Sequence, residues 1–148
     1  MGEGETQLEV GDRAATYWFD FTLSQVERVE SWGEFHPQEG EQLVVCTLEL
    51  KNTFSSDVPM NRWDFTMVWQ DASGEMDGAY PLLRSLEEQL PDEYELEKGQ
   101  IRQGKLVFVL PQEVEQAALS FQERFVEGEQ GSQCTLGNTF QVWFPLLK

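Results

Sequence analysis

The side chains that most often perform chemistry are scarce in this sequence. His36 is the only histidine, and it precedes Pro37 in a predicted turn, while the two cysteines, Cys46 and Cys134, lie far apart in the chain. Nucleophilic catalysis requires a base within reach of its nucleophile, and a zinc site requires three or four nitrogen or sulfur ligands. We therefore expect no catalytic residues, no tightly bound transition metal and no cofactor.

Carboxylates, in contrast, are plentiful, since the chain has 27 acidic residues. In such a chain paired carboxylates are expected by chance, and glycoside hydrolysis also requires a cleft that holds the sugar between them. The segment Asp71–Asp77 resembles a calcium loop but lacks the EF-hand spacing, because Gly74 stands at its fourth position. It indicates a hairpin turn between two strands. Weak calcium binding by Asp71, Glu75 and Asp77 remains open.

The charge of the chain limits its partners. Ten basic residues against the 27 acidic ones give a net charge of −17, spread over both halves. Nucleic acid and anionic membrane surfaces would be repelled. No stretch approaches the length of a membrane span, so we expect no membrane insertion. Met1–Val10 has no apolar core of a signal peptide, so the chain is either cytosolic or the mature part of an exported protein.

Apolar residues alternate with polar ones in several segments, which is the pattern of half-buried strands. Turn-forming residues separate these segments. The pattern predicts an all-β fold, an immunoglobulin-like antiparallel β-sandwich of about seven strands over residues 13–148, after a flexible segment over residues 1–12. The clearest runs are Tyr17–Leu23, Leu43–Leu50, Phe65–Trp69, Leu106–Leu110, Leu119–Phe121 and Phe140–Phe144.

One segment does not follow the strand pattern. The leucines of Leu82–Leu90 fall at helical spacing and Pro91 ends the run, which predicts one short connecting helix. Cys46 lies in a run that is apolar on both faces, so we expect it to be buried, and a Cys46–Cys134 disulfide remains open. The residues expected to be largely buried between the sheets are Phe19, Phe21, Leu48, Leu50, Phe65, Trp69, Leu106, Phe108, Phe121, Phe140 and Val142.

Two of the five tryptophans are out of phase with the apolar faces of their strands. If Tyr17, Phe19 and Phe21 face the core, then Trp18 and Asp20 face outward. By the same alternation, Gln141 and Trp143 face outward from the last strand. First and last strands often lie side by side in immunoglobulin-like sandwiches, so these four residues could form one exposed partner-binding surface. The alternative is that another segment covers both indoles.

Three segments carry a resemblance to a known family: LVVCTLELKNTFSSDVPM (Leu43–Met60), WDFTMVWQDASGEMDGAY (Trp63–Tyr80) and LEKGQIRQGKLVFVLP (Leu96–Pro111). In this order they resemble a bacterial family of small immunoglobulin-like domains of unknown function. That family occurs in secreted proteins and lipoproteins, and its fold is similar to that of a mycobacterial immunoprotective extracellular antigen. The likeness covers roughly residues 10–146 and marks strands and turns.

The resemblance implies an extracellular or cell-envelope location and brings no catalytic residues with it. We therefore expect a non-catalytic binding module whose partner is a protein or a cell-wall saccharide. A structural or accessory spacer domain is the alternative, and a saccharide-binding or hydrolytic domain is the third hypothesis.

Overall fold

The computed structural model describes residues 4–127 and 133–146. Eleven strands and one 3-10 turn account for most of them. In chain order these are β1 (Gly4–Glu9), β2 (Arg13–Ala15), β3 (Phe19–Val29), β4 (Glu41–Asn52), β5 (Val58–Asn61), η1 (Arg62–Asp64), β6 (Thr66–Gln70), β7 (Met76–Ala79), β8 (Glu93–Leu96), β9 (Ile101–Pro111), β10 (Gln116–Glu127) and β11 (Gln133–Pro145).

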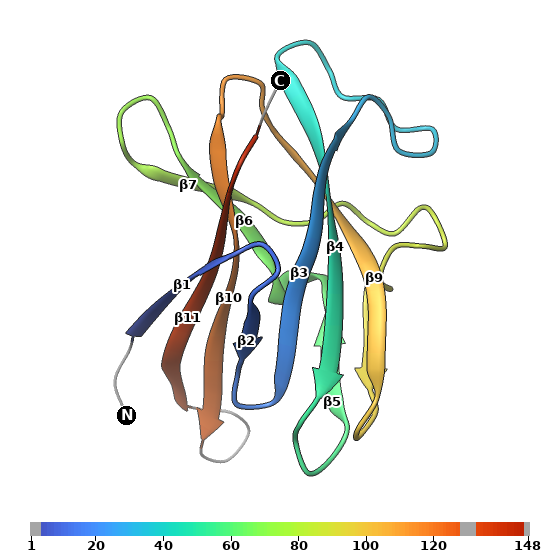
Figure 1. Ribbon diagram of the computed structural model, residues 1–148, viewed down its shortest axis with the longest axis vertical. Helices are drawn as coiled ribbons and strands as arrows, with labels where there is room; N and C mark the ends of the chain where they lie inside the picture. Colours follow the sequence, from blue (N-terminus) through green and yellow to red (C-terminus); the bar gives the residue numbers. More distant parts are fainter. Residues whose placement is uncertain (1–3, 128–132, 147–148) are drawn as a thin grey trace.

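The strands form a β-sandwich, as the alternation predicts. One sheet has five strands in the order β1-β11-β10-β6-β7, the other has four in the order β2-β3-β4-β9, and β5 pairs with β8 in a small third sheet. Figure 1 shows β3, β4 and β9 side by side on one side of the molecule and β1, β11 and β10 on the other. Residues Gly4–Glu9, where the sequence predicts no strand, pair with β11 in the parallel sense, whereas the neighbouring β10–β11 pair is antiparallel.

The core lies between the two large sheets and is rich in phenylalanine. Every residue predicted to be buried there exposes 6 % of its surface or less. Phe19 and Phe21 of β3 meet Phe121 of β10 with ring centroids 5.0 and 6.1 Å apart, and Phe65 joins them. These contacts tie the first long strand of one sheet to the middle of the other. Cys46 is buried on β4 as a free thiol, and burial raises its pKa; the side chain of Cys134 lies outside the described residues.

The predicted helix over Leu82–Leu90 is wrong, because this segment is irregular in the structure. Its leucines pack in two directions instead of along one helix face. Leu82 and Leu86 cover the outer face of the four-stranded sheet, where they join a second hydrophobic cluster with Trp32, while Leu90 packs into the main core. Leucines at helical spacing therefore belong here to an irregular loop, which contacts both the second cluster and the main core.

A buried glutamine holds this loop in place. The Oε1 atom of Gln89 accepts hydrogen bonds from the indole Nε1 of Trp32 at 2.8 Å, from the amide of Ser85 at 2.8 Å and from the amide of Leu86 at 2.9 Å. The loop then runs along the edge of β9, where Leu90 donates its amide to the carbonyl of Lys105 and Lys105 donates to Glu88.

Gly104 allows this close approach, because a Cβ at that position would lie 2.6 Å from a methyl group of Leu90. The loop thereby covers an edge that would otherwise expose unpaired backbone groups.

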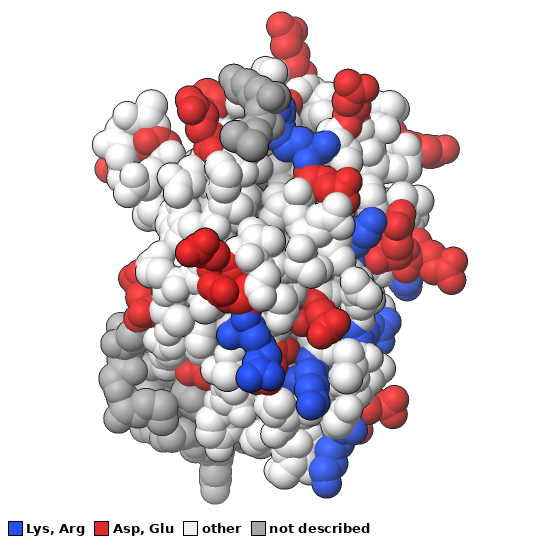
Figure 2. Space-filling view, viewed as in Figure 1, with Lys and Arg blue, Asp and Glu red and all other residues white. Residues whose placement is uncertain are grey.

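The excess of acidic residues is distributed over the surface. Figure 2 shows acidic side chains scattered over the face that carries β3 and β4, with the fewer basic side chains mostly in its lower half. No helix among residues 4–127 and 133–146 is long and apolar enough to cross a membrane.

Candidate functional site

The structure does not bring together the four residues that the sequence places on one surface. Trp18 precedes β3 in the four-stranded sheet, whereas Trp143 lies on β11 in the five-stranded sheet. The strand beside β11 is β1, and not β3. The expectation that the first strand places Trp18 next to Trp143 depended on starting the sheet at Tyr17, and the earlier strand β1 takes that position.

Trp18 and Asp20 have separate surroundings. Trp18 is half-buried, packs against the main core and meets the ring of Tyr17 edge-on with centroids 5.3 Å apart. Tyr17 itself is 56 % exposed and does not face the core, because β3 begins only at Phe19. Asp20 lies on the strand β3 and approaches Arg13, with Nε and Oδ2 3.8 Å apart.

Gln141 and Trp143 lie on the outer face of the five-stranded sheet. The indole Nε1 of Trp143 donates to Oε1 of Gln141 at 3.3 Å, and Nε2 of Gln7 on β1 donates to the same oxygen at 3.1 Å. Trp143 lines a hollow of about 880 Å³ that lies toward the β9–β10 turn. Both residues are half-buried, so β11 presents them as a covered pair and not as a bare aromatic patch.

The acidic turn is organised by its own hydrogen bonds. Oδ1 of Asp71 accepts from the hydroxyl of Ser73 at 2.6 Å and from the backbone amides of Ser73 and Glu75. The Ser73 hydroxyl is the main reason that the pKa of Asp71 lies below its usual value. Asp77 accepts from the amide of Gly78. Among the described residues no group of three or more potential ligands is arranged to hold a metal ion.

A cleft of about 860 Å³ lies beside β10, and it is the place where aromatic and polar side chains converge. β10 has twelve residues, but β6 pairs with only three of them, Ala118 to Ser120. The cleft spans the end of this pairing, because the paired strands contribute Thr66, Val68 and Ser120 to its lining and β10 contributes Phe121, Gln122 and Arg124 beyond it. We call it the Trp63 cleft; its walls are Trp18, Phe19, Phe54, Asp57, Val58, Pro59, Met60, Asn61, Trp63, Asp64, Thr66, Val68, Tyr80, Ser120, Phe121, Gln122, Arg124 and Thr139.

Trp63 and Tyr80 are the exposed aromatic residues of this cleft. Trp63 is 54 % exposed and Tyr80 is 53 % exposed. Their rings meet edge to face, with centroids 4.8 Å apart. Large aromatic side chains that are exposed and held in one position are typical of partner-binding surfaces, because little freedom remains to be lost on binding.

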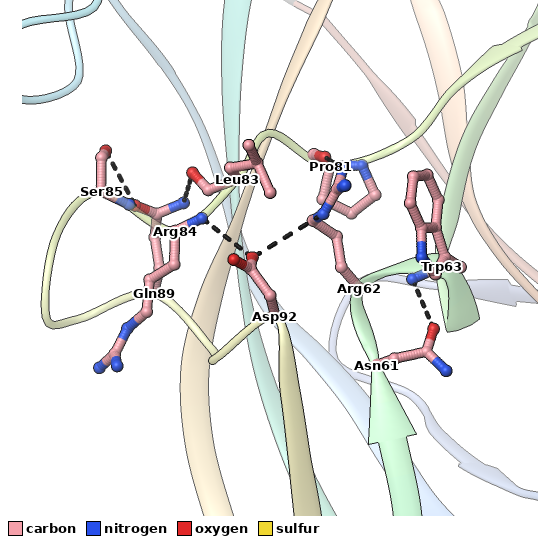
Figure 3. Close-up of polar contacts among 9 residues, drawn as sticks. All are labelled: Asn61, Arg62, Trp63, Pro81, Leu83, Arg84, Ser85, Gln89 and Asp92. Carbon is pink, nitrogen blue, oxygen red and sulfur yellow. Dashed lines mark hydrogen bonds and ion pairs between the residues drawn. The ribbon is translucent and has the colours of Figure 1, made fainter.

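Arg62 fixes the position of Trp63, as Figure 3 shows. The Arg62 guanidinium carbon lies 4.0 Å from the centroid of the Trp63 ring. Its Nη1 donates to the carbonyl of Pro81 at 2.7 Å, and its Nε lies 3.8 Å from Oδ1 of Asp92. Asp92 in turn accepts from the backbone amide of Arg84 at 3.0 Å. The indole is therefore supported by a charged side chain that is itself anchored to the loop before β8.

The local sequence explains why Trp63 points outward. Asn61 begins the 3-10 turn η1 and its Oδ1 accepts from the amide of Trp63 at 2.9 Å, while Oδ2 of Asp64 accepts from the amide of Asn61 at 2.7 Å. This reciprocal capping box tightens the turn. Phe65, the residue after the turn, enters the core, whereas Trp63 within the turn is exposed.

Two residues of opposite charge, Asp64 and Arg124, line the cleft. Burial is the main cause that raises the pKa of Asp64, and the positive charge of Arg124 on β10 acts in the opposite direction. Burial is the main reason that the pKa of Tyr94 is raised, and the negative charge of Asp64 raises it further. The ion pairs among the described residues do not include one between Asp64 and Arg124.

Sequence reasoning missed Trp63, Tyr80 and the cleft itself; of the lining residues it named only Trp18 as a site residue, and it assigned Phe19 and Phe121 to the core. One local signal was available. The pattern Asn61-Arg62-Trp63-Asp64 is a capping box, which predicts the start of a helical turn at this point. The end of β6 beside β10 could not be predicted, because it depends on pairing between distant segments.

Comparison with known proteins supports the fold. No family model matches the sequence, and no curated protein matches it. Solved structures do. The YcdA protein of Bacillus subtilis, a predicted lipoprotein, superposes with a TM-score of 0.62 at 15 % identity, over 90 % of this chain and 38 % of that one. The likeness is one of fold.

Two further structures match over nearly their whole length. The YjhA protein of Bacillus subtilis has a TM-score of 0.60 at 17 % identity, covering 91 % of this chain and 98 % of that one. The secreted protein MPT63 of Mycobacterium tuberculosis has a TM-score of 0.59 at 12 % identity, covering 93 % and 97 %. The expected similarity to a mycobacterial extracellular antigen and to lipoprotein domains is confirmed at the level of the fold. The chain spans little more than a third of the length of YcdA.

Proposed function

We propose that this protein is a non-catalytic binding module of the bacterial cell envelope or extracellular space, and that the Trp63 cleft is its binding surface. The observation that carries the proposal is an exposed indole, held by Arg62, at the mouth of a cleft with polar and apolar walls. Such concave sites with a few convergent polar groups are the usual place of ligand binding. The proposed envelope or extracellular location is supported by the similar fold of a predicted lipoprotein and of a secreted protein.

The composition of the cleft supports binding without chemistry. Its lining contains no histidine or cysteine, and the carboxylate of Asp64 is engaged with the backbone of Asn61. The net charge of −17 disfavours nucleic acid as a partner. A protein or a neutral saccharide remains compatible with these walls.

The test is retention on cell-surface material. The purified domain is incubated with washed Bacillus subtilis cell walls and, separately, with immobilised surface-protein extract, and the bound fraction is measured. We expect Trp63→Ala to weaken binding about tenfold or more, as for a central aromatic contact. Ile101→Ala is the matched control, because Ile101 is also exposed, at 62 %, but lies on β9.

Equal retention of wild type and Trp63→Ala would refute the Trp63 cleft as the site. Failure of the wild-type domain to bind either material would refute the binding module and favour an accessory domain. That second candidate rests on the YcdA comparison, in which this fold makes up 38 % of a longer chain. In a spacer domain, substitution of Trp63 would change neither binding nor localisation of the full-length protein.

A further inference from the structure

The edge of β9 and the part of β10 beyond Ser120 differ in their backbone pairing. The edge of β9 is covered by the loop over residues 82–90, through backbone hydrogen bonds from Leu82 to Val107 and from Leu90 to Lys105. Beyond Ser120 the edge of β10 pairs with no described strand, because the pairing with β6 ends there. The β10–β11 register shifts between Gln122 and Arg124, and the Glu123 carboxylate accepts the backbone amide of Tyr17 at 2.7 Å. An open strand edge is a template for a further strand.

Resting on the proposed function, we propose that the Trp63 cleft takes an extended peptide, which pairs with β10 along residues 121–124 as an added strand. The peptide would occupy the position in the sheet that β6 occupies beside Ala118 to Ser120. Figure 1 shows β10 continuing beyond the start of β6 toward the end of the molecule where β5 lies. Recognition of this kind draws its affinity from main-chain hydrogen bonds and its specificity from alternate side chains.

The opposite wall of the cleft is also a strand. β5 pairs with β8 in a two-stranded sheet, and all four residues of β5 line the cleft. The cleft therefore reaches from the strand β5 to β10, and it extends to Val68 of β6 and Thr139 of β11. This arrangement suits an elongated backbone more closely than a compact ring.

The two faces of an added strand would meet different side chains, because successive residues of a strand point to opposite sides. On the inner side the cleft is lined by the core residues Phe19, Met60 and Phe121. On the outer side lie Gln122 of β10 and the exposed ring of Trp63. We therefore expect an apolar residue at every second position of the peptide.

Charge indicates a basic peptide. Asp57 and Asp64 line the cleft against the single guanidinium of Arg124, and the whole chain carries a net charge of −17. Such a field attracts cationic partners and its effect weakens with added salt. A lysine or arginine of the peptide placed beside Asp64 would supply the partner that Arg124 does not provide at ion-pair distance.

The probe is a phage-displayed library of random dodecapeptides, selected on the wild-type domain after depletion on Trp63→Ala. The tightest peptide is then synthesised, and its amides are N-methylated one at a time. Strand addition predicts that methylation at every second residue weakens binding about tenfold or more, because each lost main-chain hydrogen bond leaves a backbone group without its partner. Methylation at the intervening residues should be tolerated. Hydrogen exchange of the complex should slow at residues 121–124.

Each result bears on the proposal. Alternating sensitivity together with protection at β10 supports it. Sensitivity without alternation, or protection confined to another strand, overturns it. A third result is that no peptide is enriched, cell walls still bind through Trp63, and a soluble wall saccharide competes for this binding. The ligand is then a glycan, so the peptide proposal is refuted and the proposed function stands. If neither peptides nor cell-surface material bind, both fall.

Discussion

The support of Trp63 by Arg62 gives a prediction that can be worked out from the contacts. Arg62→Ala removes a charged hydrogen bond to the Pro81 carbonyl at 2.7 Å, an ion pair with Asp92 at 3.8 Å and the stacking on Trp63 at 4.0 Å. The Arg62 side chain is only 17 % exposed, whereas that of Asp92 is 43 % exposed.

The hydrogen bond is worth about 1.5–3 kcal/mol when its donor is charged. The ion pair adds about 0.2–1 kcal/mol and the cation–π contact about 0.5–1 kcal/mol. Because one guanidinium makes all three contacts, they are not additive. We expect Arg62→Ala to lower the free energy of unfolding by about 2–3 kcal/mol, which moves a urea midpoint by roughly 1 M or more.

The assay is equilibrium unfolding in urea, compared with Arg13→Ala as the control. Arg13 makes an ion pair of the same length, 3.8 Å, but its side chain is 76 % exposed, so its loss should cost about 0.5 kcal/mol or less. Arg62→Lys should fall between wild type and alanine, since lysine keeps the charge but lacks the planar fork. Equal destabilisation by Arg62→Ala and Arg13→Ala would refute the bracing of Trp63.

Three other substitutions test the fold and its electrostatics. Phe108→Ala, at a fully buried position, should cost about 3–5 kcal/mol in chemical unfolding, and a loss below about 1 kcal/mol would contradict the core assignment. Gln89→Met should cost about 2–3 kcal/mol in the same measurement, since it leaves the buried Trp32 indole and two loop amides without their acceptor; an unchanged midpoint would show that water replaces it. Burial raises the pKa of Asp64 above 3.8, so the folded state binds its proton more tightly than the unfolded chain and this group destabilises the fold as pH rises through its folded pKa. The stability of Asp64→Asn relative to wild type should therefore increase from pH 3.8 toward neutrality, and a difference independent of pH would contradict the effect of burial.

The long strands were predictable because their side chains alternate. Phe140, Val142 and Phe144 are buried on β11 as the alternation predicts, and Phe19 and Phe21 are buried on β3. A residue pattern with a period of two is a direct consequence of a sheet with one buried face. The similar solved structures share the overall fold.

The shorter elements could not be predicted, because other segments decide them. β1 is a polar stretch that becomes a strand by pairing with β11. The leucines of the segment over residues 82–90 have helical spacing, yet Gln89 and the edge of β9 hold them in an extended loop. In both cases backbone hydrogen bonds to a distant strand override the local preference.

The candidate site was only partly accessible to sequence reasoning. The sequence predicts that Trp18 faces outward or is covered by another segment; in the structure Trp18 is half-buried, packs against the main core and lines the cleft. The prediction places Trp18 next to Trp143 because it assumes that the first and last strands are neighbours. In the structure Trp18 precedes β3 of the four-stranded sheet, whereas Trp143 belongs to the five-stranded sheet. The capping box of Asn61 and Asp64 indicated the turn that carries Trp63, but the cleft beside it is formed by segments that are distant in the sequence.

The most direct test of the Trp63 cleft is the nuclear magnetic resonance signal of the indole N–H groups. The five tryptophan Nε1–H signals are assigned by single Trp→Phe substitutions and followed while the domain is titrated with solubilised Bacillus subtilis surface material. The account predicts that the Trp63 signal shifts or broadens while that of Trp32, held by Gln89 at 2.8 Å, does not move. A shift of the Trp143 signal with an unchanged Trp63 signal would contradict it.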